Sequence, residues 1–167
     1  MQKQTADLTQ HIHQHYRFEC FGPDGKLKWR EELDNLVVTE GMNDILTKYY
    51  KGSAYTAALY VGLKGAGTVV AADAMASHAG WTEVVAYSEA VRQTLTMGTA
   101  AAGSLDNSAA KATFSMNGAY TVAGAFVATD STKSGTTGTL VGAGDFAASR
   151  SGGSGDTIQV TITASLS

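Results

Sequence analysis

The stretch from residue 107 to residue 129 restricts the possible folds of this chain more than any other part of the sequence. Residues 110–116 alternate between apolar and polar side chains, which is the period-2 pattern of a half-buried strand. Asn117-Gly118 follows, and this pair favours the tight turn of a β-hairpin because both residues tolerate positive φ. Residues 120–127 carry apolar or small side chains on both faces, so we expect this second strand to be covered on both sides. The stretch therefore predicts a hairpin inside a β-fold.

Six further segments carry strand patterns between turn signals: residues 16–20, 27–33, 58–63, 92–97, 139–141 and 157–164. The last one has the most regular alternation, with Ile158, Val160 and Ile162 on one face and threonine and glutamine on the other. The sequence Pro23-Asp24-Gly25-Lys26 predicts a tight β-turn between the first two segments. Eight strands separated by turns are typical of a β-sandwich or a jelly roll.

One helix is predicted, at about residues 40–51. An apolar stripe with the spacing i, i+3, i+4 and i+7 is formed by Met42, Ile45, Leu46 and Tyr49. Thr39 is expected to be the N-cap, and Gly52 is expected to end the helix. We expect the apolar stripe to cover one end of the sandwich.

The predicted fold class is mainly β: a jelly-roll-like antiparallel β-sandwich of about eight strands with one short helix. A chain of 167 residues can form one domain with a substantial core. Residues 1–15 are polar and start without periodicity, so we expect a flexible N-terminal arm. Residues 16–167 are expected to form a single β-sandwich domain.

Composition and charge argue against several functional classes. Charged residues make up 16% of the chain, against about 25% in typical proteins, which suits a surface covered by partners. The net charge is −3 and the 12 Lys and Arg residues are scattered, so no nucleic-acid-binding patch is expected. The sequence has no apolar run near the roughly 20 residues of a transmembrane helix and no signal-peptide pattern. The lone Cys20 argues against an internal disulfide framework and is expected to be a small buried residue.

Three histidines, His11, His13 and His15, occupy alternate positions near the start of the chain. On a strand they would share one face, and three imidazoles on one face could bind zinc or nickel. A metal site also needs rigid support and hydrogen-bonded ligands, which a chain start offers poorly. We therefore interpret them as solvated polar residues and assign no metal ligand.

Two other patterns resemble catalytic or cofactor motifs. Residues 142–147 match the G-x-G-x-x-A form of a dinucleotide fingerprint, but no helix pattern follows the glycines, so a flexible loop is expected. Ser77-His78 with Asp73 and Glu83 nearby invites a hydrolase interpretation, but adjacent Ser and His side chains usually point apart. We expect His78 to hydrogen-bond locally and hold a long loop. We assign no catalytic or cofactor-binding residue and expect no enzyme, although paired carboxylates of the glycosidase type stay open at this stage.

Several short motifs together resemble a family of small virion proteins of tailed bacteriophages. They are residues 35–41 (NLVVTEG), 59–63 (LYVGL), 77–83 (SHAGWTE), 87–88 (YS), Arg92, 124–126 (GAF), 138–140 (GTL) and 155–157 (GDT). The resemblance covers roughly residues 16–165. It implies a structural component of the particle and supplies no catalytic residues.

Within that class, the resemblance favours a capsid cement or decoration protein. Such a protein would bind the outer surface of the major capsid protein shell and stabilise it, in a virion made in the host bacterial cytoplasm. Symmetry suggests self-assembly into a closed ring, most plausibly a trimer. No cofactor, nucleic acid or membrane is expected as a partner.

Two alternatives stay open at this point. The first is a tail-associated module of the tube, tip or fibre. The second is a carbohydrate-binding sandwich that recognises host glycans through Trp29, Trp81 or Tyr87, although a tryptophan in a sandwich is more often part of the core. The copy number in the particle separates the capsid from the tail, and glycan binding through an exposed Trp81 identifies the second alternative.

Overall fold

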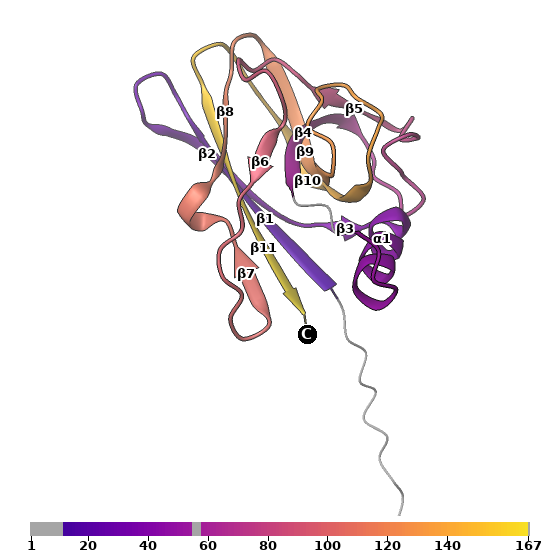
Figure 1. Ribbon diagram of the computed structural model, residues 1–167. Coiled ribbons are helices and arrows are strands. Elements are labelled where there is room, and N and C mark those ends of the chain that lie inside the picture. Colours follow the sequence, from indigo (N-terminus) through magenta and orange to yellow (C-terminus); the bar gives the residue numbers. More distant parts are fainter. Residues whose placement is uncertain (1–11, 55–57, 167) are drawn as a thin grey trace, which may run out of the picture.

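The computed structural model describes residues 12–54 and 58–166, which form two antiparallel β-sheets and one α-helix (Figure 1). The first sheet has the order β2 (Leu27–Asp34), β1 (Ile12–Phe21) and β11 (Thr157–Leu166), with β7 (Ser104–Asp106) and β8 (Ala112–Ser115) both pairing with β11. The second sheet has the order β3 (Leu36–Val37), β10 (Leu140–Gly152), β9 (Tyr120–Ala128) and β4 (Leu59–Gly67), with β5 (Trp81–Val84) and β6 (Gln93–Leu95) both pairing with β4. Helix α1 spans Thr39–Tyr50, and a 3-10 turn spans Ser108–Ala110.

This architecture confirms the predicted β-sandwich with one short helix. The described residues form eleven strands instead of about eight, because β3, β5 and β7 have only two to four residues each and are too short to show a period. No helix in residues 12–54 and 58–166 is long and apolar enough to span a membrane.

The main core lies between the two sheets and is built from the residues of both sheets that face inward. Phe18, Phe114 and Ile158 are fully buried there. Cys20 is buried with them, as expected, and its Sγ lies 3.3 Å from the hydroxyl oxygen of Tyr120. The regular alternation predicted for the last strand is confirmed by β11, which pairs with β1 over ten residues.

A second, smaller core covers the outer face of the second sheet. It contains Val38, Met75, Trp81, Phe126, Ala128, Leu140 and Ala143. The residues between β4 and β5 supply Met75 and form part of this cover. Strand β9 contributes to both cores, since Val127 faces the main core and Phe126 faces the smaller one. The expectation that this strand is covered on both sides is therefore confirmed.

The predicted hairpin around Asn117-Gly118 is wrong. Strand β8 belongs to the first sheet and pairs with β11, whereas β9 lies in the second sheet between β10 and β4. The backbone around the turn bonds to other segments: the N–H of Met116 donates to the carbonyl of Asp156, and the N–H of Asn117 donates to that of Ala86. Tertiary pairing has overridden the local turn preference, and the turn carries the chain from one sheet to the other.

The flexible loop expected at residues 142–147 is also wrong, because these residues lie within the 13-residue strand β10. Its glycines lie where no side chain fits. A Cβ on Gly142 would overlap the side chain of Asn35, and one on Gly144 would overlap that of Leu33. Glycine in this stretch therefore allows close packing between strands instead of marking a loop.

The start of the fold also differs from the expectation. Strand β1 begins at Ile12, so residues 12–15 of the expected arm belong to the first sheet, where β11 and β2 flank them. Thr39 is the first helical residue and not the N-cap; that position is held by Val38, which makes no side-chain capping bond. The N–H of Thr39 donates instead to the carbonyl of Ala71. The turn predicted at residues 23–26 is confirmed by the hydrogen bond from the N–H of Gly25 to the carbonyl of Gly22.

We expect Gly124→Ala to lower the free energy of unfolding by about 1–3 kcal/mol or more, because overpacking a rigid interior is costly. Gly124 lies in the middle of the second sheet, and a Cβ there would overlap the carbonyl oxygen of Gly144. Gly153→Ala is the matched control, because no atom lies within 4 Å of its added Cβ. Urea unfolding of both variants measures the difference, and equal stability of the two would contradict the packing argument.

Candidate functional site

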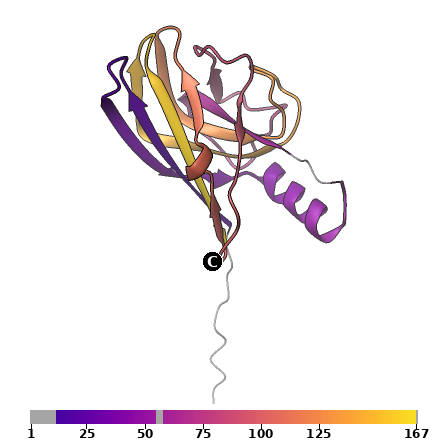
Figure 2. The same cartoon turned by 60° about the vertical axis from the view of Figure 1, so that its left-hand side comes forward.

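Helix α1 attaches to the sandwich by its first turn and leaves most of its apolar stripe exposed. Gly41 is the buried residue of α1, and its Cα lies against the backbone of Val141 so closely that a Cβ would overlap it. Leu46 is 54% exposed and Tyr49 is 82% exposed. Figure 2 shows α1 projecting from the side of the sandwich. The expectation that this stripe covers one end of the sandwich is therefore wrong, since its side chains meet solvent.

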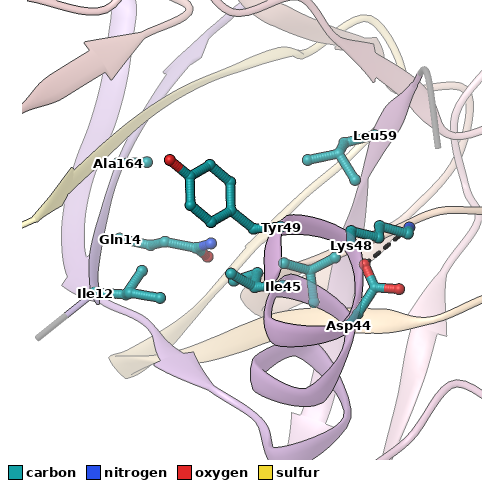
Figure 3. Close-up of a pocket in the computed structure, with 9 residues that line it drawn as sticks. Ile12, Gln14, Asp44, Ile45, Lys48, Tyr49, Leu59 and Ala164 are labelled. Atoms are coloured by element: carbon teal, nitrogen blue, oxygen red, sulfur yellow. Dashed lines mark ion pairs between the residues drawn. The ribbon is translucent and has the colours of Figure 1, made fainter. Parts of the chain in front are cut away.

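A hollow of about 350 Å³ lies between α1 and the neighbouring strands. It is lined by Ile12, Gln14, Asp44, Ile45, Lys48, Tyr49, Leu59, Val141 and Ala164. In Figure 3 the ring of Tyr49 extends from α1 toward Ala164 of β11, and Ile45 lies close to Gln14 and Ile12 of β1. Helix and sheet thus form two walls of one apolar hollow.

A second hollow of about 310 Å³ continues the first one along the end of the first sheet. The two share Ile12, Ile45 and Ala164, and the second adds Leu105 and Leu166. We call the two hollows together the α1 groove. With the exposed side chains of Met42, Leu46, Tyr49 and Tyr50 beside it, the groove forms the α1 surface. Continuous apolar surfaces of this kind mark interaction sites.

Three polar groups that line the α1 groove are paired within the chain: Asp44, Lys48 and the side-chain oxygen of Gln14. Asp44 and Lys48 form an ion pair with a 2.9 Å separation between carboxylate and ammonium. The side-chain oxygen of Gln14 accepts hydrogen bonds from the Tyr16 hydroxyl and from the amide of Asn35. The groove therefore presents apolar atoms and a neutral ion pair to a partner.

The charged residues under the loops of the second sheet serve the fold. Arg92 is fully buried and forms a two-point ion pair with Glu83, with N–O distances of 3.1 and 2.8 Å. Its remaining donors bond the carbonyls of Asp130 and Gly135. Arg92 thereby fixes the segment after β9 to the outer face of the sheet.

Lys64, which is fully buried, forms a second ion pair with the partly exposed Asp145, at 2.6 Å. They flank Gly124 in the register of the sheet, so the side chain of Lys64 spans a position without a side chain to reach its partner. Lys64 also donates to the carbonyls of Gly65 and Gly67. All of these bonds hold strands and loops together.

The four residues of the hydrolase pattern are held in separate local contacts. His78 stacks on Trp81 with ring centroids 4.1 Å apart, and its Nδ1 lies 3.4 Å from the carbonyl oxygen of Trp81. Asp73 accepts a hydrogen bond from Nε1 of Trp81, and Glu83 pairs with Arg92. Ser77 bonds Ala74 through its backbone. The local contact predicted for His78 is therefore present, and its role in holding the loop stays a prediction.

The aromatic residues considered for glycan binding belong to the interior. Trp81 is 3% exposed and Tyr87 is 1% exposed. Trp29 is half-buried and packs edge-on against Phe146. A sugar ring needs an exposed aromatic face, so the carbohydrate hypothesis based on Trp81 loses its site.

The histidines near the chain start do not converge on a metal site within the described residues. His15 lies 3.0 Å from a carboxylate oxygen of Asp34 and 3.8 Å from one of Glu32. His11 lies outside the described residues. Across residues 12–54 and 58–166, no group of three or more His, Cys, Asp or Glu side chains is arranged to hold a metal ion.

The outer face of the first sheet is charged and paired within itself. Glu19 lies between two cations, at 2.7 Å from Lys111 and 2.8 Å from Arg30. Hydrogen bonds from Lys111 and then Arg30 lower the pKa of Glu19 to about 2. Arg17 and Glu32 form a further pair on this face. Opposite charges alternate here, so this face offers neither an apolar docking surface nor a basic patch for nucleic acid.

No protein-family model matches the chain, and no curated protein is significantly similar to it in sequence. The α1 surface was missed by sequence reasoning even though the stripe of Met42, Ile45, Leu46 and Tyr49 was visible. Helical spacing shows that one face is apolar but does not show whether that face is covered.

Glu83→Gln is expected to destabilise the protein by about 3–5 kcal/mol, because it leaves the buried guanidinium of Arg92 without its counter-charge. Glu32→Gln is the control: it removes a carboxylate of the same type from a half-exposed pair with Arg17 and should cost less than about 1 kcal/mol. Chemical unfolding followed by tryptophan fluorescence measures both. A similar small loss in the two variants would show that the Arg92 pair is not a structural anchor.

The contribution of Glu19 to stability should depend on pH. Its pKa is lower in the folded chain than in the unfolded one, so its pairing stabilises the fold above about pH 5 and is lost as the pH falls toward 2. Glu19→Gln should therefore reduce stability at pH 7 and approach the wild type near pH 2.5. Thermal unfolding of both proteins between pH 7 and 2.5 measures this, with Asp34→Asn, a change at a 93% exposed side chain, as the control. A stability difference that does not change with pH would contradict it.

Proposed function

We propose that this protein is a structural component of a large assembly, which binds neighbouring protein subunits and catalyses no reaction. The α1 surface is the observation that supports this proposal most directly. A sandwich held by two cores presents an apolar helix face beside an apolar groove, and such surfaces on folded proteins serve association with other proteins.

The use of the buried polar groups supports the same function. Arg92, Glu83, Lys64 and Asp145 anchor loops and strands to one another. Asp156 binds Lys28 and the hydroxyl of Tyr120 across the end of the sandwich. These charged groups give a rigid body that can hold a fixed position between neighbouring subunits.

Among assemblies, we propose a tailed-bacteriophage virion, with this protein as a cement or decoration protein on the outer surface of the major capsid protein shell. The motifs that resemble phage virion proteins support this assignment. Trp81, Glu83 and Arg92 are among the motif residues, and all three hold the cover of the second sheet. The resemblance therefore concerns residues on which this architecture depends.

The copy number in purified particles tests this proposal. Quantitative mass spectrometry should find the protein at a ratio to the major capsid protein that is close to stoichiometric, as a shell component requires. Shells depleted of the protein should bind it again from solution in the same ratio. A few copies per particle would move the protein to the tail, and absence from particles would overturn the virion assignment.

A further inference from the structure

We propose that the α1 surface binds a second copy of this chain, with Tyr50 of one copy seated in the α1 groove of the other. The inference rests on the proposed function only in that both make the α1 surface a protein-binding surface. It adds the identity of the partner and the residues that meet.

The shape of the surface is self-complementary. Tyr50 projects from the last turn of α1 and is 79% exposed. Its neighbour Tyr49 lines the groove, and the two rings meet edge to face with centroids 5.2 Å apart. A projection and a hollow thus lie side by side on one surface. A contact in which each copy inserts its projection into the hollow of the other uses the same patch twice, as a symmetric interface requires.

The size of the surface fits a stable contact between two copies. An aromatic side chain covers about 150–250 Å², so two tyrosines that are about four-fifths exposed present roughly 300 Å². Further exposed area comes from Ile12, Met42, Leu46 and Leu166, which are between 37% and 64% exposed. The sum approaches the roughly 800 Å² that each partner contributes to a standard interface. Tyrosine is also one of the residue types that dominate binding energy at interfaces.

The electrostatics of the surface allow it to meet its own copy. Asp44 and Lys48, the charged residues that line the groove within the described part of the chain, neutralise each other within one helix, so the groove itself brings no net charge into an apolar interface. A strongly basic or acidic partner would find no complementary patch here. The chain carries a net charge of −3, and its repulsion between two copies is small at physiological salt.

The groove is held in place before a partner arrives. Its floor is formed where β1 and β11 pair, with Ile12 opposite Leu166 and Gln14 opposite Ala164. On the helix side, the contact of Gly41 with Val141 fixes the first turn of α1. A preformed hollow loses little freedom on binding, which favours association.

Sedimentation velocity and light scattering of the purified full chain over a series of concentrations test this inference. The wild type should self-associate as two copies around a twofold axis, because the proposed contact is reciprocal. Tyr50→Ser removes the projection, and Ala164→Glu places a charge in the groove. Each should weaken self-association about tenfold or more, as expected for an interface hot spot.

Two controls separate a lost contact from a lost fold. Val91→Ser changes an apolar residue that is 45% exposed and does not line the groove, so it should leave self-association unchanged. Mixing Tyr50→Ser with Ala164→Glu should restore part of the association, because Tyr50 of the second variant can enter the intact groove of the first. Misfolded variants would not complement each other in this way.

A wild type that stays monomeric at the highest soluble concentration would overturn the inference, whether the groove is then filled by residues 1–11 of the same copy or by another protein. Self-association that neither variant weakens would overturn it as well. A monomer that still binds depleted shells would leave the proposed virion function intact. Self-association by a protein absent from particles would contradict the virion assignment alone.

Discussion

The structure depends on one constraint: the central strand β9 is apolar on both faces, so the second sheet has to be covered on both sides. The first sheet covers the inner face with regular strands. The outer face is covered largely by loops, together with Val38 just before α1. Loops carry backbone polar groups that need partners once they are buried. The cover can form only if buried side chains satisfy those groups.

Arg92 supplies hydrogen-bond donors to these buried polar groups. Its guanidinium lies 5.0 Å from the centroid of the Phe126 ring, and it donates two hydrogen bonds to Glu83 and two to loop carbonyls. A planar group with fixed donors suits this task, whereas the single ammonium of a lysine would leave acceptors without a partner. Lys64 has a related role at the end of its own strand β4, where it donates to the carbonyls of Gly65 and Gly67 and pairs with Asp145 of β10. The buried charge of Arg92 therefore satisfies polar groups of the buried loops, and that of Lys64 connects β4 to β10.

The elements that could be predicted from the sequence are those whose apolar side chains recur with a clear period. Strand β11 and the position of α1 could be predicted because their side chains alternate or repeat with a clear period. The hairpin predicted at Asn117-Gly118 is wrong because the turn preference of this pair does not show whether the two flanking strands share a sheet. The continuation of β10 beyond the predicted residues 139–141 was missed, because Gly142 and Gly144 are glycines that allow close packing against residues more than 100 positions earlier. The candidate site was missed for the same reason, since exposure of a helix face is a property of the whole fold.

The exposure of α1 follows from the way its first turn is attached to the sandwich and is not a sign of loose packing. Glu40 in its first turn accepts hydrogen bonds from the backbone N–H groups of Met75 and Leu140, which ties the helix start to the loop cover and to β10. With Gly41 pressed against Val141, the helix axis is fixed, and the helix cannot rotate its stripe toward the sandwich without breaking these bonds. Among residues 12–54 and 58–166, no side chain covers the rings of Tyr49 and Tyr50, which lie largely in solvent. Removing these rings from water is favourable, and the groove beside them gives the shape that a covering molecule or segment has to complement.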